Sequence, residues 1–540
     1  MITLQGKGVS TGIAKGRLSF LRRKTLSVER RPIDNVEEEI ERFNTARQTA
    51  AAQLDELAAT MQDKIGEENA LLFEIHRMML EDSDYCDPVE EIIRTEKVCA
   101  EYAVNTAGSR LAKDFAEMED DEYMNARAVD VYDVTKRVVE ILSGENQSLD
   151  RSNEPVILAT DDFTPSETAQ LDRSKVLALV SRQGAANSHT AIFARTMGIP
   201  AIIGFGAFLS GDLSGKEAIL DGESGVLYLD PEPEVIEELE AKQEELRKEK
   251  EKLEQFRGKP TLTKDGRSME LYANIGSVSD AGAALAGDAE GVGLFRSEFL
   301  YLGRDTHPDE DTQYASYRKA LEKMEGRQVI IRTLDIGADK QVDYFDLPKE
   351  ENPALGMRAI RICLTRPKIF RTQLRAIYRA SAHGNAAIMF PMISSLDELR
   401  RSKEVAKSVR EELAAEGIPF DADVPIGIMI ETPASAIISD ILAKEVDFFS
   451  IGTNDLTQYT LAVDRQNDSI SSFCDTHHEA ILRLIKLTCD NAHKAGIWCG
   501  ICGSLGADLS LTKTFVEMGL DELSVEPSCI LKLRALIAEC

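Results

Sequence analysis

Residues 426–432 read IGIMIET and residues 447–454 read DFFSIGTN, two short apolar runs that each end in polar residues. Runs of this length, rich in β-branched and aromatic residues, are typical of buried strands. Six more occur in the C-terminal half: MELYANI (269–275), GVGLFRS (291–297), QVIIRTL (328–334), AAIMFPM (386–392), GIWCGIC (496–502) and ELSVEP (522–527). Helical stretches alternate with them. Eight such units over roughly 280 residues predict a (β/α)8 barrel.

Polar side chains stand at the C-terminal ends of most of these predicted strands, the end at which such barrels build their active sites. They are Asn274, Arg296, Arg332, Glu431, Asn454 with Asp455, and Cys502. Four arginines offer planar donors that suit the paired oxygens of phosphate and carboxylate: Arg296, Arg332, Arg358 and Arg465. A small anion that carries both groups is therefore the expected substrate.

Three of these residues suggest particular chemistry. Glu431 and Asp455 end consecutive predicted strands and offer hard oxygen ligands for a magnesium ion shared with a substrate phosphate. A pair of surface carboxylates is the alternative interpretation. Cys502 is either a small buried apolar residue or, at the mouth of an anion site, a general acid.

The N-terminal half begins with a strand-like segment, GKGVSTGIAKGRLSFL (6–21), and continues as a helical block. Apolar residues recur every three or four positions from Val36 to Met61, after a possible capping box of Asp34 and Glu37. Further helical patterns extend from residue 67 to about residue 142. Strand-like runs follow, and residues 217–230 resemble a hairpin. The opening segment is free to pair with this later unit, which would make the helical block an insertion.

Charge and composition exclude several classes of protein. The formal charge of −30 disfavours nucleic acid and anionic membrane surfaces and favours a basic protein partner. No signal peptide or membrane span is predicted, and the nine dispersed cysteines are typical of reduced cytoplasmic thiols. Residues 231–257 form a strongly charged pattern that predicts a mostly solvated connecting helix.

Residues 186–195, ANSHTAIFAR, contain one histidine ahead of an apolar, helix-like run. His189 is either a residue at the start of a helix or a nucleophile. A neutral imidazole attacks readily near its pKa of about 6.5 and holds a phosphoryl group in a labile form.

These motifs together resemble Enzyme I of the bacterial phosphoenolpyruvate-dependent sugar phosphotransferase system, from the first residues to the last. The resemblance rests on DDFTPSETAQL, SHTAIFAR, EGVGLFRSEFLY, IIRTLDIGADK, KEENPALGMRAIR, GIMIETPA, IGTNDLTQYTLAVDR and CGICGS. It implies a swivelling α/β phosphohistidine domain (1–32 and 143–230), an inserted helical HPr-binding domain (33–142), a linker helix (231–258) and a barrel that binds phosphoenolpyruvate and Mg²⁺ (259–540). It also implies a cytoplasmic homodimer that associates through its barrels.

The resemblance also implies residue roles. His189 would accept the phosphoryl group of phosphoenolpyruvate and pass it to a histidine of the small carrier HPr. Substrate would bind Arg296, Arg332, Arg358, Asn454, Asp455 and Arg465. Glu431 and Asp455 would hold Mg²⁺, and Cys502 would protonate the enolpyruvate carbon. HPr would dock around residues 67–82 and 110–137.

The sequence departs from the family pattern at five positions: Ala185, Asn187, Ser297, Ala338 and Ser504, the last where a glutamate is usual. Ala185, Asn187 and Ser504 motivate an alternative, a degenerate paralogue that binds HPr or pyruvate as a regulator without turnover. A dikinase or phosphoenolpyruvate synthase is a further alternative. It would need an ATP-binding domain, for which the residues before the linker leave no space.

Overall fold

The computed structural model describes residues 1–21, 28–65, 67–116, 122–144, 154–169, 171–172, 174–184, 189–302, 304, 306–337, 343–347 and 350–540. The chain divides into two compact units, Met1–Lys248 and Glu249–Cys540, each described here by itself. Among the described helices, none has the length and apolar character needed to cross a lipid bilayer. All nine cysteines are free thiols.

The first unit contains one mixed sheet in the order β1-β8-β7-β3-β4-β5-β6-β2. Its strands are β1 (Ile2–Gln5), β2 (Lys7–Ser10), β3 (Ile13–Phe20), β4 (Val156–Thr160), β5 (Val176–Ser181), β6 (Ala201–Ile203), β7 (Glu217–Asp221) and β8 (Val226–Leu229). β3 pairs with both β4 and β7, and β1 pairs with β8. The opening segment therefore joins the later strands, and the predicted insertion is confirmed.

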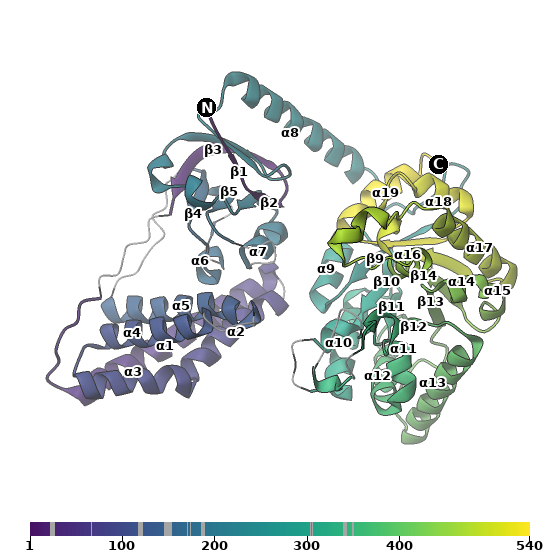
Figure 1. Cartoon of the computed structure of the whole chain (residues 1–540), viewed down its shortest axis with the longest axis horizontal. Helices are drawn as coiled ribbons and strands as arrows, with labels where there is room; N and C mark the ends of the chain where they lie inside the picture. Colours follow the sequence, from purple (N-terminus) through teal and green to yellow (C-terminus); the bar gives the residue numbers. More distant parts are fainter. Residues whose placement is uncertain are drawn as a thin grey trace. The chain divides into compact units, whose positions relative to one another are not determined.

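The described residues of the inserted block form five helices: α1 (Val36–Ile65), α2 (Glu67–Glu81), α3 (Ser83–Glu96), α4 (Ala100–Ala116) and α5 (Glu122–Ser143). They pack lengthwise against one another (Figure 1). The start of α1 differs from the predicted capping box by one residue. Asn35 Oδ1 accepts the Glu38 N–H at 3.4 Å, so Asn35 and Glu38 replace Asp34 and Glu37. Adjacent Asp and Asn residues cap helices equally well, so sequence does not choose between them.

Two short helices connect the sheet to this block, α6 (Pro165–Ala169) and α7 (His189–Met197). α6 is bound to α5, because Arg137 donates to Ser166 Oγ at 2.8 Å and Asp133 accepts the Ser166 N–H at 3.2 Å. α7 packs against α1 and β2. The helix that begins at His189 is thus set between the sheet and the inserted helices.

The linker helix α8 (Pro233–Glu254) is less solvated at its start than its composition predicts. Leu239 is buried against Ile13 and Ile219. Lys242 pairs with Asp221 at 2.8 Å, and Gln243 donates to the Ile13 carbonyl at 2.9 Å. The sheet therefore holds the first half of the helix.

The second unit is a closed parallel barrel of eight strands, which confirms the predicted fold class. Its strands are β9 (Glu270–Ile275), β10 (Gly291–Arg296), β11 (Val329–Arg332), β12 (Ala386–Phe390), β13 (Ile426–Ile430), β14 (Phe448–Ile451), β15 (Trp498–Ile501) and β16 (Glu522–Val525). The helices are α9 (Val278–Ala286), α10 (Glu310–Lys323), α11 (Ile360–Thr365), α12 (Pro367–Ser381), α13 (Leu396–Glu416), α14 (Pro433–Ile437), α15 (Ser439–Leu442), α16 (Thr453–Leu461), α17 (Glu479–Ala495), α18 (Thr512–Met518) and α19 (Ile530–Ile537).

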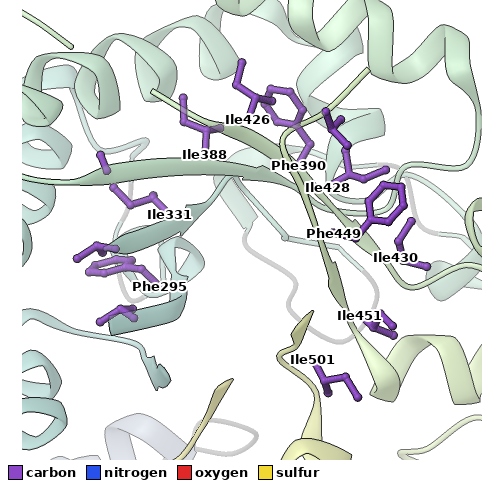
Figure 2. Close-up of a cluster of buried hydrophobic side chains, with 14 of the residues drawn as sticks. Phe295, Ile331, Ile388, Phe390, Ile426, Ile428, Ile430, Phe449, Ile451 and Ile501 are labelled. Carbon is purple, nitrogen blue, oxygen red and sulfur yellow. The ribbon is translucent and has the colours of Figure 1, made fainter. Parts of the chain in front are cut away.

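Successive side chains along each barrel strand point to opposite faces of the sheet, so the apolar side chains form two separate layers. One set of side chains packs between strands and helices and includes Phe295, Ile331, Phe390 and Phe449 (Figure 2). The other set fills the lumen and contains Leu294, Ile330, Ala387, Met389, Met429, Phe448 and Cys502. The lumen is thus a packed core that supports the C-terminal face from below.

Candidate active site in the barrel

A cavity of about 270 Å³ opens at the C-terminal ends of the strands. Seven of the residues singled out in the sequence line it: Arg296, Arg332, Glu431, Asn454, Asp455, Arg465 and Cys502. They come from the ends of β10, β11, β13 and β15, from the first turn of α16 and from the loop after it. Residues far apart in sequence meet here because parallel strands end at one face.

Arg332 is held in place by two carboxylates. Its guanidinium lies 2.5 Å from Glu298 Oε1 and 3.0 Å from Asp335 Oδ2, and the side chain is buried. Burial alone would lower the pKa of Arg332, but these carboxylates outweigh it and raise the pKa above its usual value. Among the described residues, Arg332 Nε has no hydrogen-bond partner, so one buried donor stays free beside the cavity.

Arg358 lies behind this cavity, in an adjoining one of about 460 Å³ that it shares with Asp455 and Arg465. Its guanidinium lies 3.0 Å from Asp335 and 3.3 Å from Asp455, and it donates to the Tyr459 hydroxyl at 2.9 Å. Arg358 therefore affects the first cavity indirectly, because it positions Asp335 and Asp455, which line that cavity.

Glu431 is deeply buried at the cavity, with 1% of its surface exposed. The Met392 N–H donates to Glu431 Oε1 at 2.6 Å, and Met392 adopts a left-handed φ of 57° to do so. Burial raises the pKa of Glu431 to about 8, and the charges of Asp455 and Asp335 act in the same direction. This cluster of acids would be stabilised by a cation.

Cys502 lies directly after β15 with its backbone N–H bound to the Ile451 carbonyl at 3.1 Å. The side chain is 4% exposed, and burial raises the pKa of its thiol to about 12. Cys502 is consequently a protonated thiol at neutral pH, which is the form that a general acid requires. Its neighbour Ser504 is exposed and donates to Asn454 Oδ1 at 2.5 Å.

The structure bears differently on the remaining sequence features. α7 begins at His189, but the His189 side chain and residues 185–188 lie outside the described part of the chain, as does Ala338. Conversely, sequence analysis did not single out Glu298 and Asp335, which orient Arg332 and Arg358. Their spacing was a usable signal, since each follows an arginine of the site by two or three residues.

Comparison with known proteins agrees with this architecture. Three family profiles match in order: "PEP-utilising enzyme, N-terminal" over residues 5–127, "PEP-utilising enzyme, mobile domain" over 152–225 and "PEP-utilising enzyme, PEP-binding domain" over 250–540. Relatives named phosphoenolpyruvate-protein phosphotransferase share this length. The protein of Bacillus sp. (strain S) is 42% identical over 99% of this chain and 92% of its own. That of Priestia megaterium is 41% identical over 99% and 94%, and that of Bacillus subtilis (strain 168) is 42% identical over 100% and 95%. On these matches, the chain belongs to the phosphoenolpyruvate-protein phosphotransferase family.

Proposed function

We propose that this chain transfers the phosphoryl group of phosphoenolpyruvate to His189 and then to a histidine of the carrier protein HPr, the first step of sugar uptake by the phosphotransferase system. The observation that carries the proposal is the barrel cavity, which combines guanidinium groups, carboxylates and a protonated thiol in about 270 Å³. A small phosphorylated carboxylate needs this combination.

The arginines bind and orient the substrate anion. Arg332 offers its free Nε, and the more exposed Arg296 and Arg465 supply further planar donors at the cavity. Arg358 acts indirectly by fixing Asp335 and Asp455. Phosphoryl transfer depends mainly on positioning and on stabilisation of charge, which these groups provide.

Glu431 and Asp455 suit a magnesium ion. Burial and then the like charges of Asp455 and Asp335 raise the pKa of Glu431, and a divalent cation would be stabilising among these charges. Among the described residues, no group of three or more His, Cys, Asp or Glu side chains could hold a metal. This agrees with Mg²⁺, which commonly takes one or two carboxylates and fills its other positions with water and substrate oxygens. When bound, it would neutralise charge on the phosphoryl oxygens.

Cys502 supplies a proton to the methylene carbon of the enolate as the phosphoryl group leaves. Burial keeps its thiol protonated, with a pKa of about 12. The thiol also opens onto the cavity that contains the arginines. Cys502 is therefore the general acid of this proposal.

His189 is the nucleophile. It begins α7, and the dipole of a helix favours a negatively charged phosphoryl group at its N-terminus. The proposal divides the chain into a phosphohistidine domain (1–32 and 143–230), an HPr-binding domain (33–142), a linker (231–258) and a barrel (259–540). The tether keeps the histidine at a high effective concentration near the barrel, and a hinge allows it to move away toward HPr.

HPr docks on α2 and α5 in this proposal. Among the side chains described on these helices, three large apolar ones are exposed, Met78 (59%), Val129 (39%) and Tyr132 (51%), as at the centre of a protein interface. The chain carries a net charge of −30, which suits a partner with basic groups around its histidine.

Two barrels associate in the proposed homodimer, and the reaction takes place in the cytoplasm. Ile437 (60% exposed) and Ile441 (43% exposed) lie at the end of α14 and in α15 and offer apolar surface for such a contact. Nine free thiols suit a reducing compartment.

The test is incubation of the protein with Mg²⁺ and phosphoenolpyruvate that carries a labelled phosphoryl group. An acid-labile phosphoryl group should appear on the protein and move to added HPr. Absence of label would refute the transferase and leave a non-catalytic regulator, while label on His189→Ala would refute the residue assignment. Cys502→Ala should slow labelling by phosphoenolpyruvate far more than labelling by phosphorylated HPr, because only the former step forms pyruvate.

A further inference from the structure

A carboxyl group lies inside the barrel, below the cavity. Glu522, the first residue of β16, is 2% exposed. A side chain on Gly500 would clash with its Oε2, and one on Gly293 would stand 2.6 Å from its Oε1, so its carboxyl group occupies the lumen. Among the described residues, neither oxygen has a hydrogen-bond partner. Burial raises the pKa of Glu522 well above its usual value, and the charges of Glu270 and Asp521 act in the same direction, which favours the protonated acid.

The register of three neighbouring strands places Glu522 in line with Ser450. Ser450 of β14 is opposite Gly500 of β15, and Gly500 is opposite Glu522 of β16. Gly500 has no side chain, so nothing from β15 separates the two polar groups. Cys502 follows Gly500 by two residues and points to the same side of the strand, into the lumen.

Both polar groups interact with the Cys502 thiol. Burial is the main cause that raises the pKa of Cys502; the Ser450 hydroxyl opposes this effect, and the Glu522 carboxyl group, when ionised, adds to it. Ser450 is 1% exposed, and its Oγ has no hydrogen-bond partner in the part of the chain that the structure describes. Because Ser450 Oγ bonds to neither Cys502 nor Glu522, rotation of the whole side chain about χ1, and not of the O–H bond alone, is the movement that would bring it to each neighbour.

The proposed reaction leaves Cys502 in need of a proton. After the thiol protonates carbon, the sulfur is a thiolate in a site that strongly disfavours charge, and the pyruvate just formed occupies the cavity above it. The thiol must be restored before the next turnover. A donor inside the barrel would avoid the occupied mouth.

We propose that Ser450 and Glu522 form a proton-supply line that reloads Cys502 from the opposite end of the barrel; this rests on the function proposed above. The Ser450 O–H bond breaks as its proton forms the S–H bond of Cys502. Ser450 Oγ takes the proton of the Glu522 carboxyl group, which leaves a carboxylate. Water then returns a proton to Glu522 and becomes hydroxide, which bulk buffer neutralises. Neither residue touches the substrate, so both act through Cys502.

Glu270 marks the solvent end of the line. It begins β9, is exposed, and pairs in register with Glu522. Other titratable groups near Glu522 are Asp521, Tyr272 and Cys499. Of these carboxyl groups, Glu270 is the one that both adjoins Glu522 in the sheet and contacts water.

The experiment compares the first turnover with the steady state in the full-length protein. Glu522→Gln keeps the size of the side chain and removes the acid, and Ser450→Ala removes the bridging hydroxyl. Ser439→Ala is the matched control, since it removes an equally buried hydroxyl that faces α17 instead of the lumen. Quench-flow with enzyme in excess measures pyruvate from the first turnover, and HPr-coupled assays in H₂O and D₂O measure the steady state.

In both lumen variants we expect a first turnover within about twofold of wild type, because Cys502 begins protonated. Steady-state turnover should fall by about tenfold or more with an unchanged KM and an increased solvent isotope effect. Ser439→Ala should match wild type. Wild-type steady-state rates in Glu522→Gln and Ser450→Ala would overturn the proposal, as would equal losses in first and later turnovers. No first turnover in the wild type would instead refute the proposed function.

Discussion

Replacement of Arg358 by methionine should destabilise the barrel strongly. The Arg358 side chain is 5% exposed and pairs with Asp335 and Asp455, whose side chains are 4% and 9% exposed. In this variant Asp335 keeps its ion pair with Arg332, but Asp455 loses the Arg358 guanidinium, which it contacts at 3.3 Å. Loss of one partner from a buried ion pair costs about 3–5 kcal/mol, because the remaining charge is left without compensation. For the unit Glu249–Cys540, with an unfolding entropy of about 2.1 cal/mol/K per residue, we expect the Tm to fall by roughly 5–8 °C.

The assay is differential scanning calorimetry of the full chain, with the barrel transition followed separately. Arg401→Met is the matched control: its side chain is 52% exposed and lies 3.8 Å from an exposed Asp397, so the loss should be below about 1 kcal/mol. The double variant Arg358→Met/Asp455→Asn should recover part of the loss, because the uncompensated carboxylate is gone. Equal Tm values for the two single variants would refute the reasoning, and so would a double variant no more stable than Arg358→Met.

Three further outcomes are expected. Ser504→Ala removes the hydroxyl hydrogen bond to Asn454 and should raise the KM for phosphoenolpyruvate by a factor of about 5, measured in steady-state assays; an unchanged KM would mean that Ser504 does not position Asn454. The Cys502 thiol, with a pKa of about 12, should react with iodoacetamide later than the more exposed Cys474, and its rate should rise about tenfold per pH unit from pH 7 to 10 as the thiolate fraction grows; site-resolved mass spectrometry measures both. Lys97 ends α3 with a left-handed φ of 50°, so Lys97→Gly should stabilise the first unit by about 0.5–1 kcal/mol in calorimetry, and a lower Tm would contradict this.

Sequence patterns predict the barrel well because each strand carries its own signal. The run before Glu431, for example, is apolar, short and followed by a helix cap at Thr432. The polar residues at the ends of the strands can likewise be identified from sequence without knowing which strands pair. The parallel geometry of any such barrel brings them to one face.

Contacts between distant residues could not be predicted in this way. The Arg332–Glu298 pair depends on the register between β10 and β11, and Arg358 reaches Asp455 across almost a hundred residues of chain. The contacts of the linker helix could not be predicted from sequence either. Its composition predicts solvation, whereas Asp221 and the Ile13 carbonyl, from distant parts of the chain, bind its first half.

The inserted helical block has a consequence for synthesis of the protein. β1 pairs with β8, so Ile2 meets Leu229 only after most of the first unit has been made. At about 5–20 residues per second, the first strands wait on the order of 10–40 s for their partners. The helices make mainly local contacts and can fold during this delay. A nascent chain would therefore carry a folded helical bundle while β1 to β3 still present unpaired edges, and this interval is when we expect ribosome-associated chaperones to bind it.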